Sequence, residues 1–199
     1  NITKESLRRQ IGYVPQKNVL FSGTIASNLL YGFEADPKDV QKEMQENNLS
    51  EEEAVSKLAD ISMKKAAQIA QATEFINEKP EQYDSAIAQS GGNVSGGQKQ
   101  RLAIARALVK KCPIYIFDDS FSALDFKTDA QLRKALKSET TNATVLIVAQ
   151  RVGTIMGADQ IIVLDEGKIA GIGTHRELLQ NCQVYADIAH SQLSEEELA

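Results

Sequence analysis

The sequence lacks an excess of basic residues. Its 199 residues include 22 Lys and Arg against 27 Asp and Glu, which gives a formal net charge of −5. A nucleic-acid-binding domain usually carries a basic face, so this balance argues against nucleic acid as a partner. The acidic excess is concentrated in residues 34–60, where nine acidic residues stand against three lysines. Such a segment is typical of a solvated helical face, and a partner-binding acidic patch is the alternative.

Cysteines are few, and long apolar runs are missing. Cys112 and Cys182 are the only cysteines and have no Cys-x-x-Cys spacing, which favours reduced thiols in a cytosolic compartment over a disulfide. No apolar run approaches the ~18 residues of a membrane-spanning helix. The start of the chain also lacks the charged-then-apolar pattern of a signal peptide. We therefore expect a soluble segment that does not itself cross a membrane.

The sequence does contain short apolar segments that predict buried strands. They are residues 11–14, 114–117, 144–149 and 160–165. These segments are apolar without alternation, as expected of strands buried on both faces of a parallel sheet. Helical patterns at 126–139 and near 151–157 separate the last three, and this order predicts an α/β fold. Residues 168–173 are predicted to pair with 160–165 as a hairpin.

Between the first and second predicted strands the patterns are helical. The candidate helices are 24–31, 37–47, 50–60, 62–72 and 96–110. Ser50, followed by Glu53, is a capping box that predicts a helix start. We therefore expect a helical block inserted between the first strand and the rest of the sheet.

The stretch "NVSGGQKQRLAIARAL", residues 93–108, combines a helix start with two glycines. Ser95 and Gln98 fit a capping box, which is a purely structural explanation. Gly96 and Gly97, however, have no Cβ and would let a ligand approach the backbone. The N-terminus of a helix attracts anions such as phosphate, so phosphate binding is the alternative explanation.

The segment 114–117 ends in two carboxylates, Asp118 and Asp119. Ligands bind at the carboxyl ends of strands in open α/β sheets. Hard cations such as Mg²⁺ take oxygen ligands, so Asp118 is a candidate for a magnesium site. The alternative is that both aspartates cap the helix that is predicted to begin at residue 126.

Taken in order, these segments resemble the nucleotide-binding domain of ABC transporters, in particular of ABC exporters. "IGYVPQ" resembles the strand that leads into the Q-loop, with Gln16 as its glutamine, and "YDSAIAQSGG" occupies the place of the X-loop. "VSGGQ" resembles the ABC signature, Asp118 the Walker B aspartate, and "SALD" the D-loop that ends at Asp125. "GTHREL" is similar to the closing motif of the family. The resemblance runs from Asn1 to about Leu179.

The resemblance implies a P-loop NTPase fold, with a RecA-like parallel-sheet core and an inserted all-α ABC helical subdomain. Residues 1–16 and 111–199 would form the core with its C-terminal helices, and 17–110 the helical subdomain, with an acidic insertion near 34–60. The implied cofactors are ATP and Mg²⁺. The implied metal-site residues are Asp118 and Gln16. The implied nucleotide contacts are Gln16, Ser95, Gly96, Gly97, Gln98 and Asp125.

The resemblance also implies partners and a location. The partners would be a second ABC nucleotide-binding domain and the transmembrane domain of the same transporter, with no nucleic acid. The domain would lie on the cytoplasmic side of the cell membrane.

One expected motif is missing, because the sequence contains no GxxxxGK(S/T) P-loop. In the family this loop precedes the Q-loop, and its backbone N–H groups and lysine cradle the phosphates. The upstream aromatic residue that stacks on adenine is missing as well. We therefore expect a fragment that binds ATP poorly or not at all in its own site.

Two residues differ from the catalytic pattern of the family. Asp119 stands where a glutamate usually orients the attacking water. Aspartate reaches ~1–1.5 Å less, and such a misplacement can cost ~10²-fold in rate. Gln150 stands where the switch histidine is usual, and glutamine can donate a hydrogen bond but cannot carry a proton near neutral pH.

The signature is intact while both catalytic positions, Asp119 and Gln150, are substituted. In the family two domains pack head to tail, and the signature of one completes the ATP site of the other. The expectation is a degenerate ATP site on this chain and a signature that serves a competent site on a different chain, as in heterodimeric multidrug exporters. The alternatives are a slow homodimeric exporter, a soluble ABC ATPase of a non-transport type, and a non-enzymatic interaction module.

Overall fold

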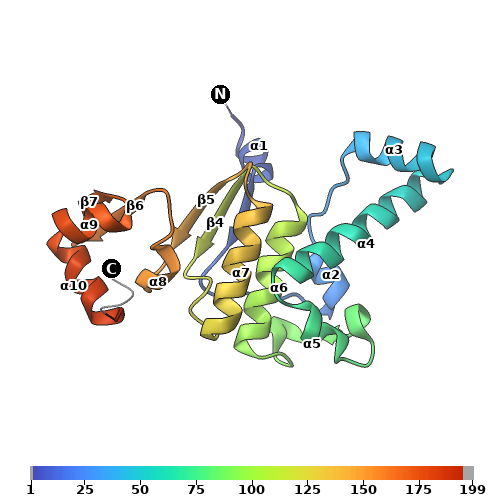
Figure 1. Cartoon of the computed structure of the whole chain (residues 1–199). Helices are drawn as coiled ribbons and strands as arrows, with labels where there is room; N and C mark the ends of the chain where they lie inside the picture. Colours follow the sequence, from blue (N-terminus) through green and yellow to red (C-terminus); the bar gives the residue numbers. More distant parts are fainter. Residues whose placement is uncertain (1, 195–199) are drawn as a thin grey trace. The chain divides into compact units, whose positions relative to one another are not determined.

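The computed structural model describes residues 2–194. The chain divides into two compact units, one that ends at Leu146 and one that begins at Ile147 (Figure 1). Among the described residues, no helix has the combination of length and apolar character that a membrane crossing requires. Both cysteines are buried free thiols.

A three-stranded sheet has the strand order β1-β4-β5, and β1, β4 and residues 144–146 of β5 belong to the first unit. The strands are β1 (Ile11–Val14), β4 (Ile114–Asp118) and β5 (Thr144–Val148). Strands β1 and β4 run parallel, with Ile11 opposite Ile114 and Val14 opposite Phe117, which confirms the predicted parallel core. Phe117 is fully buried and lies against Phe121, with 5.5 Å between the ring centroids. Strand β5 is less enclosed than predicted, since the side chains of Leu146 and Val148 are half exposed.

The helical block lies between β1 and β4 in the chain, as the sequence predicts. Its helices are α2 (Ile25–Leu29), α3 (Pro37–Asn47), α4 (Glu51–Ile69), α5 (Thr73–Asn77) and α6 (Gly96–Val109). The shorter elements of this unit are α1 (Lys4–Arg9), β2 (Gly23–Thr24), η1 (Gln82–Asp84), β3 (Ala86–Ile87) and η2 (Gln89–Gly91). Helix α6 packs against β1 and against α4, and helix α7 (Phe126–Glu139) packs against α4.

Helix α4 is one continuous helix where the sequence pattern indicated two, at 50–60 and 62–72. Neither Gly nor Pro interrupts residues 50–72, so nothing in the sequence requires a break between the two predicted ranges. A serine within a helix is tolerated when the flanking turns are packed, and here Met63 and Ala66 are buried. The predicted capping box is confirmed, because the Ser50 N–H donates to Glu53 Oε2 at 2.8 Å and the Glu53 N–H donates to Ser50 Oγ at 3.3 Å.

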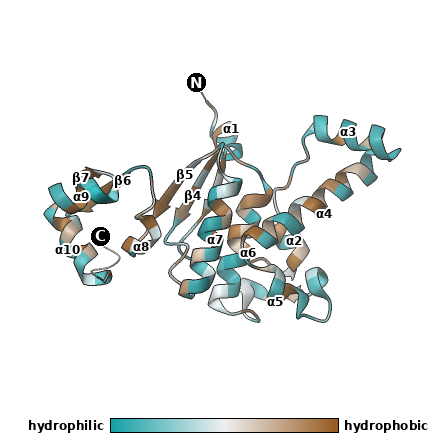
Figure 2. Cartoon of the chain, in the orientation of Figure 1, coloured by the Kyte–Doolittle hydropathy of each residue, from teal (hydrophilic) through white to brown (hydrophobic). Residues whose placement is uncertain are grey.

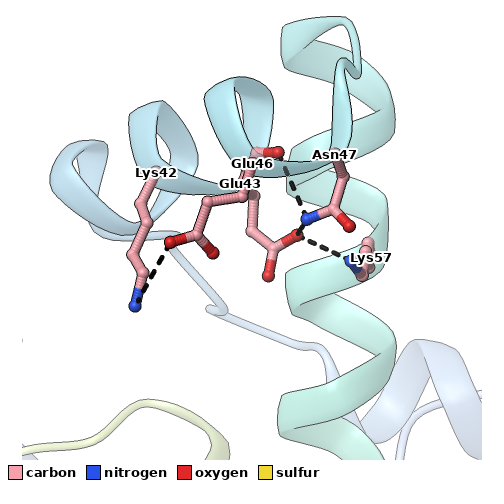
Figure 3. A network of polar contacts seen from close by, with 5 residues as sticks. All are labelled: Lys42, Glu43, Glu46, Asn47 and Lys57. Carbon is pink, nitrogen blue, oxygen red and sulfur yellow. Dashed lines mark hydrogen bonds and ion pairs between the residues drawn. The ribbon is translucent and has the colours of Figure 1, made fainter.

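The acidic segment forms a hairpin of α3 and the first half of α4, and α3 is mostly hydrophilic (Figure 2). One ion pair joins the two helices, since Lys57 Nζ lies 2.7 Å from Glu43 Oε2 (Figure 3). Asn47 Nδ2 donates to the same Glu43 oxygen at 2.8 Å, and Lys42 Nζ lies 4.0 Å from Glu46 Oε1. Several acidic side chains of the hairpin are therefore engaged by its own polar residues.

The second unit consists of α8 (Val152–Ile155), β6 (Ile161–Asp165), β7 (Lys168–Gly173), α9 (His175–Asn181) and α10 (Gln183–Gln192). Strands β6 and β7 pair antiparallel, which confirms the predicted hairpin. Within the described residues, β6 pairs only with β7, so it is not the strand of a parallel sheet that the apolar run suggested. Its side chains alternate. Ile161 and Val163 enter a buried cluster, while Ile162 and Leu164 are exposed.

Candidate functional site

The parallel pairing of β1 and β4 brings two polar loops together at the carboxyl ends of the strands. Because Val14 lies opposite Phe117, the residues two positions farther on, Gln16 and Asp119, become lateral neighbours. Gln16 Nε2 donates to Asp119 Oδ2 at 3.3 Å. This contact joins residues 103 positions apart in the chain.

Asp118 has a partner that the sequence reasoning missed. The hydroxyl of Tyr13 donates to Asp118 Oδ2 at 3.2 Å. Tyr13 lies opposite Ile116, two residues before Asp118, and alternate residues of a strand share a face, so this register could have revealed the pair. Loss of hydration and the adjacent Asp118 carboxylate raise the pKa of Tyr13, so its hydroxyl remains a donor at neutral pH.

The turn after β4 holds the second carboxylate in an uncommon backbone conformation. Asp119 has φ 45°, in the left-handed region that aspartate tolerates better than most residues. The buried Ser120 hydroxyl lies 3.0 Å from the Val14 carbonyl oxygen and 3.2 Å from the Asp118 carbonyl oxygen, bridging the ends of both strands. The Ser122 hydroxyl donates to the Asp119 carbonyl oxygen at 3.0 Å. Ser120 and Ser122 thus shape the turn that presents Asp118 and Asp119.

The interpretation of Asp118 and Asp119 as helix caps is wrong. The N-cap of α7 is Asp125, whose Oδ1 accepts from the Thr128 N–H at 2.9 Å. This hydrogen bond is the main cause of the lowered pKa of Asp125, which is therefore ionised at neutral pH. Asp118 and Asp119 remain available for other partners.

The donor set at β4 suits a magnesium ion that also binds phosphate. Among the described residues, no group of three or more Asp, Glu, His or Cys side chains could hold a metal ion alone. Mg²⁺ usually takes one or two carboxylates, keeps several waters and completes its shell with substrate phosphates. Asp118 and the amide oxygen of Gln16 are ligands of the chemical type that such a partial set needs.

The N-terminus of α6 contains the predicted capping box. The Gln98 N–H donates to Ser95 Oγ at 3.2 Å, and the Ser95 N–H donates to Gln98 Oε1 at 3.0 Å. The Ser95 hydroxyl only accepts in this cap, and its hydrogen has no acceptor among the described residues. The cap of α4 differs, because there the Ser50 hydroxyl donates to Glu53 Oε2 at 2.8 Å. The exposed Ser95 hydroxyl can therefore donate a hydrogen bond to a ligand, whereas the Ser50 hydroxyl already donates within its own cap.

The two glycines of this segment stand in different surroundings. A Cβ on Gly97 would lie 3.3 Å from the Ala123 carbonyl oxygen, so Gly97 packs closely against the turn that precedes α7. A Cβ on Gly96 would meet no atom within 4 Å. Packing among the described residues therefore accounts for the glycine at 97 but not for the exposed glycine at 96.

Two arginines attach the rest of α6 to neighbouring loops. Arg101 Nη1 donates to the Gln71 carbonyl oxygen at 2.6 Å, and its guanidinium lies 4.7 Å from the centre of the Phe75 ring. Arg106 Nη2 donates to the Val19 carbonyl oxygen at 2.9 Å. Because Val19 lies three residues after Gln16, α6 and the loop that carries Gln16 are tied together.

The structure places the candidate residues in three groups. Gln16, Asp118 and Asp119 meet at the ends of β1 and β4. The segment 95–98 lies against the turn that leads to Asp125. Gln150 belongs to the second unit, where its carbonyl oxygen accepts from Gln192 Nε2 at 3.0 Å.

Comparisons with known proteins identify similar chains. A family model described as "ABC transporter" matches residues 1–122. An uncharacterized ABC transporter ATP-binding protein of Bacillus subtilis is 44% identical over 196 residues, which cover 98% of this chain and 30% of that protein. An ATP-dependent lipid A-core flippase of Alkalilimnicola ehrlichii is 38% identical over 190 residues, which cover 96% of this chain and 29% of that protein.

A solved structure is also similar. The structure of a bacterial Atm1-family ABC exporter with ATP bound matches with a TM-score of 0.78 and 35% identity, over 97% of this chain and 30% of that chain. The present chain therefore spans less than a third of the length of these relatives.

Proposed function

This chain belongs to the ABC transporter family, and we propose that it is the ATP-binding domain of an ABC exporter, coupling ATP binding and hydrolysis to transport across a membrane. In this proposal residues 1–16 and 111–199 are core and 17–110 are the helical subdomain, with residues 1 and 195–199 of these ranges lying outside the described residues. The domain works at the cytoplasmic side of the cell membrane with the transmembrane domain of the same transporter. The named relatives that support an exporter are a flippase and an Atm1-family exporter.

We propose that the site at β1 and β4 is a degenerate ATP site. Asp118 and Gln16 would hold Mg²⁺, which neutralises phosphate charge when it is bound. Asp119 would take the place of the longer catalytic glutamate, and its Oδ2 is already engaged by Gln16 at 3.3 Å. Gln150 would donate a hydrogen bond to a phosphate without carrying charge. Both substitutions would make hydrolysis at this site slow.

We propose that the N-terminus of α6 completes a competent ATP site on a second nucleotide-binding domain of a different chain. This proposal rests on two neighbouring features. The exposed Ser95 hydroxyl is a donor, and the backbone at Gly96 has no neighbouring atom within 4 Å of a Cβ position among the described residues. The helix N-terminus, the Gln98 side chain and the closely packed Gly97 would form the rest of a phosphate-binding edge. Asp125, at the end of the adjacent turn, would face the same partner domain.

The test is made in the full-length transporter, with both nucleotide-binding domains present. Asp119→Glu combined with Gln150→His restores the length and the proton-carrying group of the usual site. We expect steady-state ATPase activity to rise, by up to ~10²-fold at this site if the reach of residue 119 limits the rate. An unchanged rate would contradict the degenerate-site assignment.

Purification decides between the proposed heterodimer and a slow homodimer. A transport-competent assembly that contains two different nucleotide-binding chains supports the heterodimer. A single gene product with full transport activity would replace it by the homodimer, in which both sites carry Asp119 and Gln150. ATPase activity without any associated transmembrane domain would favour the non-transport ATPase.

A further inference from the structure

The last residue of α10, Gln192, is bonded to both ends of the loop that carries Gln150. Gln192 Nε2 donates to the Gln150 carbonyl oxygen at 3.0 Å, and the Val152 N–H donates to Gln192 Oε1 at 2.8 Å. A peptide carbonyl can only accept and a peptide N–H can only donate, so these partners determine which way the Gln192 amide faces. The side-chain amide of Gln192 therefore fits this loop in one orientation.

The hydrogen bond from the Val152 N–H to Gln192 Oε1 caps the N-terminus of α8. Val152 is the first residue of α8, and the preceding Arg151 makes no side-chain capping bond. The first N–H groups of a helix have no partner within the helix and need one from outside. Gln192, which lies 40 residues later, provides that partner for Val152.

Packing holds the end of α10 in place. Ala189, one turn before Gln192, is fully buried, and Tyr185 is buried one turn earlier. Both belong to one hydrophobic cluster with Val152, the residue that Gln192 caps. The amide of Gln192 is thus presented by a well-packed helix, and its two bonds transmit the position of that helix to residues 150–152.

We propose that Gln192 is a positioning residue for Gln150, and that it couples the C-terminal helix α10 to the phosphate switch of this ATP site. The inference rests on the proposed function, in which Gln150 occupies the switch position. Where the Gln150 side chain points depends on its own backbone, and Gln192 holds that backbone at the carbonyl. A displacement of about 1 Å at such a position is enough to change a rate ~10²-fold.

The first test measures hydrogen exchange of the Val152 amide in the full-length transporter. Gln192→Met keeps the side-chain length but removes both hydrogen bonds, so exchange should become about two- to tenfold faster. Gln192→Glu keeps an acceptor for Val152 but loses the donor to the Gln150 carbonyl oxygen, so its exchange should lie between that of wild type and Gln192→Met. The matched control is Gln183→Met on the same helix, because the one bond of the Gln183 amide among residues 2–194 stays within α10, to Asp187 Oδ1 at 2.7 Å. Unchanged exchange in Gln192→Met, or equal acceleration in Gln183→Met, would overturn the proposal.

The second test measures turnover in the full-length Asp119→Glu, Gln150→His background. There Gln192→Met should lower kcat about tenfold while KM for ATP stays within about twofold, because orientation is lost and binding is not. A merely structural role would instead reduce the fraction of protein that binds ATP. If exchange accelerates but kcat does not change, Gln192 is a cap for α8 and not a positioning residue. If the background gains no hydrolysis, the switch role of Gln150 fails and the positioning role with it, while the exchange result still decides whether the contact exists.

Discussion

Replacing Ser95 by alanine tests whether the N-terminus of α6 serves a phosphate outside this chain. The change removes the acceptor that Gln98 N–H uses at 3.2 Å, and also the hydroxyl hydrogen that has no acceptor within the described residues. Losing a serine cap costs about 1 kcal/mol of stability. A hydrogen bond to a charged group contributes about 1.5–3 kcal/mol. If the hydroxyl donates to a phosphate in the transition state, ATPase activity of the full-length transporter should fall about 10- to 100-fold.

The control for this experiment is Ser50→Ala, the same substitution in the same motif at the start of α4. The Ser50 hydroxyl accepts from the Glu53 N–H, as the Ser95 hydroxyl accepts from the Gln98 N–H. The Ser50 hydroxyl, however, also donates its hydrogen to Glu53 Oε2 at 2.8 Å. Both variants should lose similar thermal stability by calorimetry. Only Ser95→Ala should lose ATPase activity at saturating Mg·ATP, and Ser50→Ala should stay within about twofold of wild type. Equal losses in the two variants, or full activity in Ser95→Ala, would refute the reasoning.

Three further predictions follow from the site geometry. Gly97→Ala should lower the melting temperature and Gly96→Ala should not. A Cβ would lie 3.3 Å from a carbonyl oxygen at position 97, but would meet nothing among the described residues within 4 Å at position 96. Thermal unfolding compares the two variants, and equal shifts in melting temperature would contradict the prediction. Tyr13→Phe should weaken Mg²⁺ activation of the ATPase about tenfold, because the donor to Asp118 is lost; an unaltered Mg²⁺ titration would contradict it. The lowered pKa of Asp125 means that its cap stabilises the fold above the ordinary carboxyl pKa of about 3.9 and is lost as pH falls through the lowered value. Asp125→Asn cannot titrate, so its melting temperature should depend less on pH in that acid range than that of the wild type, and identical pH profiles would exclude this role.

Local sequence patterns determined many of the elements. The predicted ranges 11–14, 37–47, 126–139 and 168–173 are those observed for β1, α3, α7 and β7. Two helix starts, at Ser50 and Ser95, can be predicted from the sequence because a capping box is formed by residues only three positions apart. The family can likewise be identified from the sequence, because each of its motifs is a contiguous stretch and the motifs occur in the expected order.

Strand pairing and helix continuity were not determined locally. An apolar run does not show whether one or both faces of a strand are covered. The run at 160–165 therefore predicts a strand buried on both faces, whereas β6 pairs with β7 and exposes Ile162 and Leu164. The sequence pattern predicts two helices, 50–60 and 62–72, where α4 is continuous, because a local pattern does not show whether neighbouring helical segments join.

The sequence by itself determined which residue types stand at the site, and only the tertiary structure decided what each of them contacts. The pairing of β1 with β4 puts Gln16 against Asp119 and Tyr13 against Asp118, more than a hundred residues apart in the chain. The sequence alone does not distinguish Gly96 from Gly97. In the structure, only Gly97 of the two packs closely against the turn before α7 among the described residues. These contacts arise from the register of strands and the placement of helices, and a shift of one residue in a strand would turn every side chain to the opposite face.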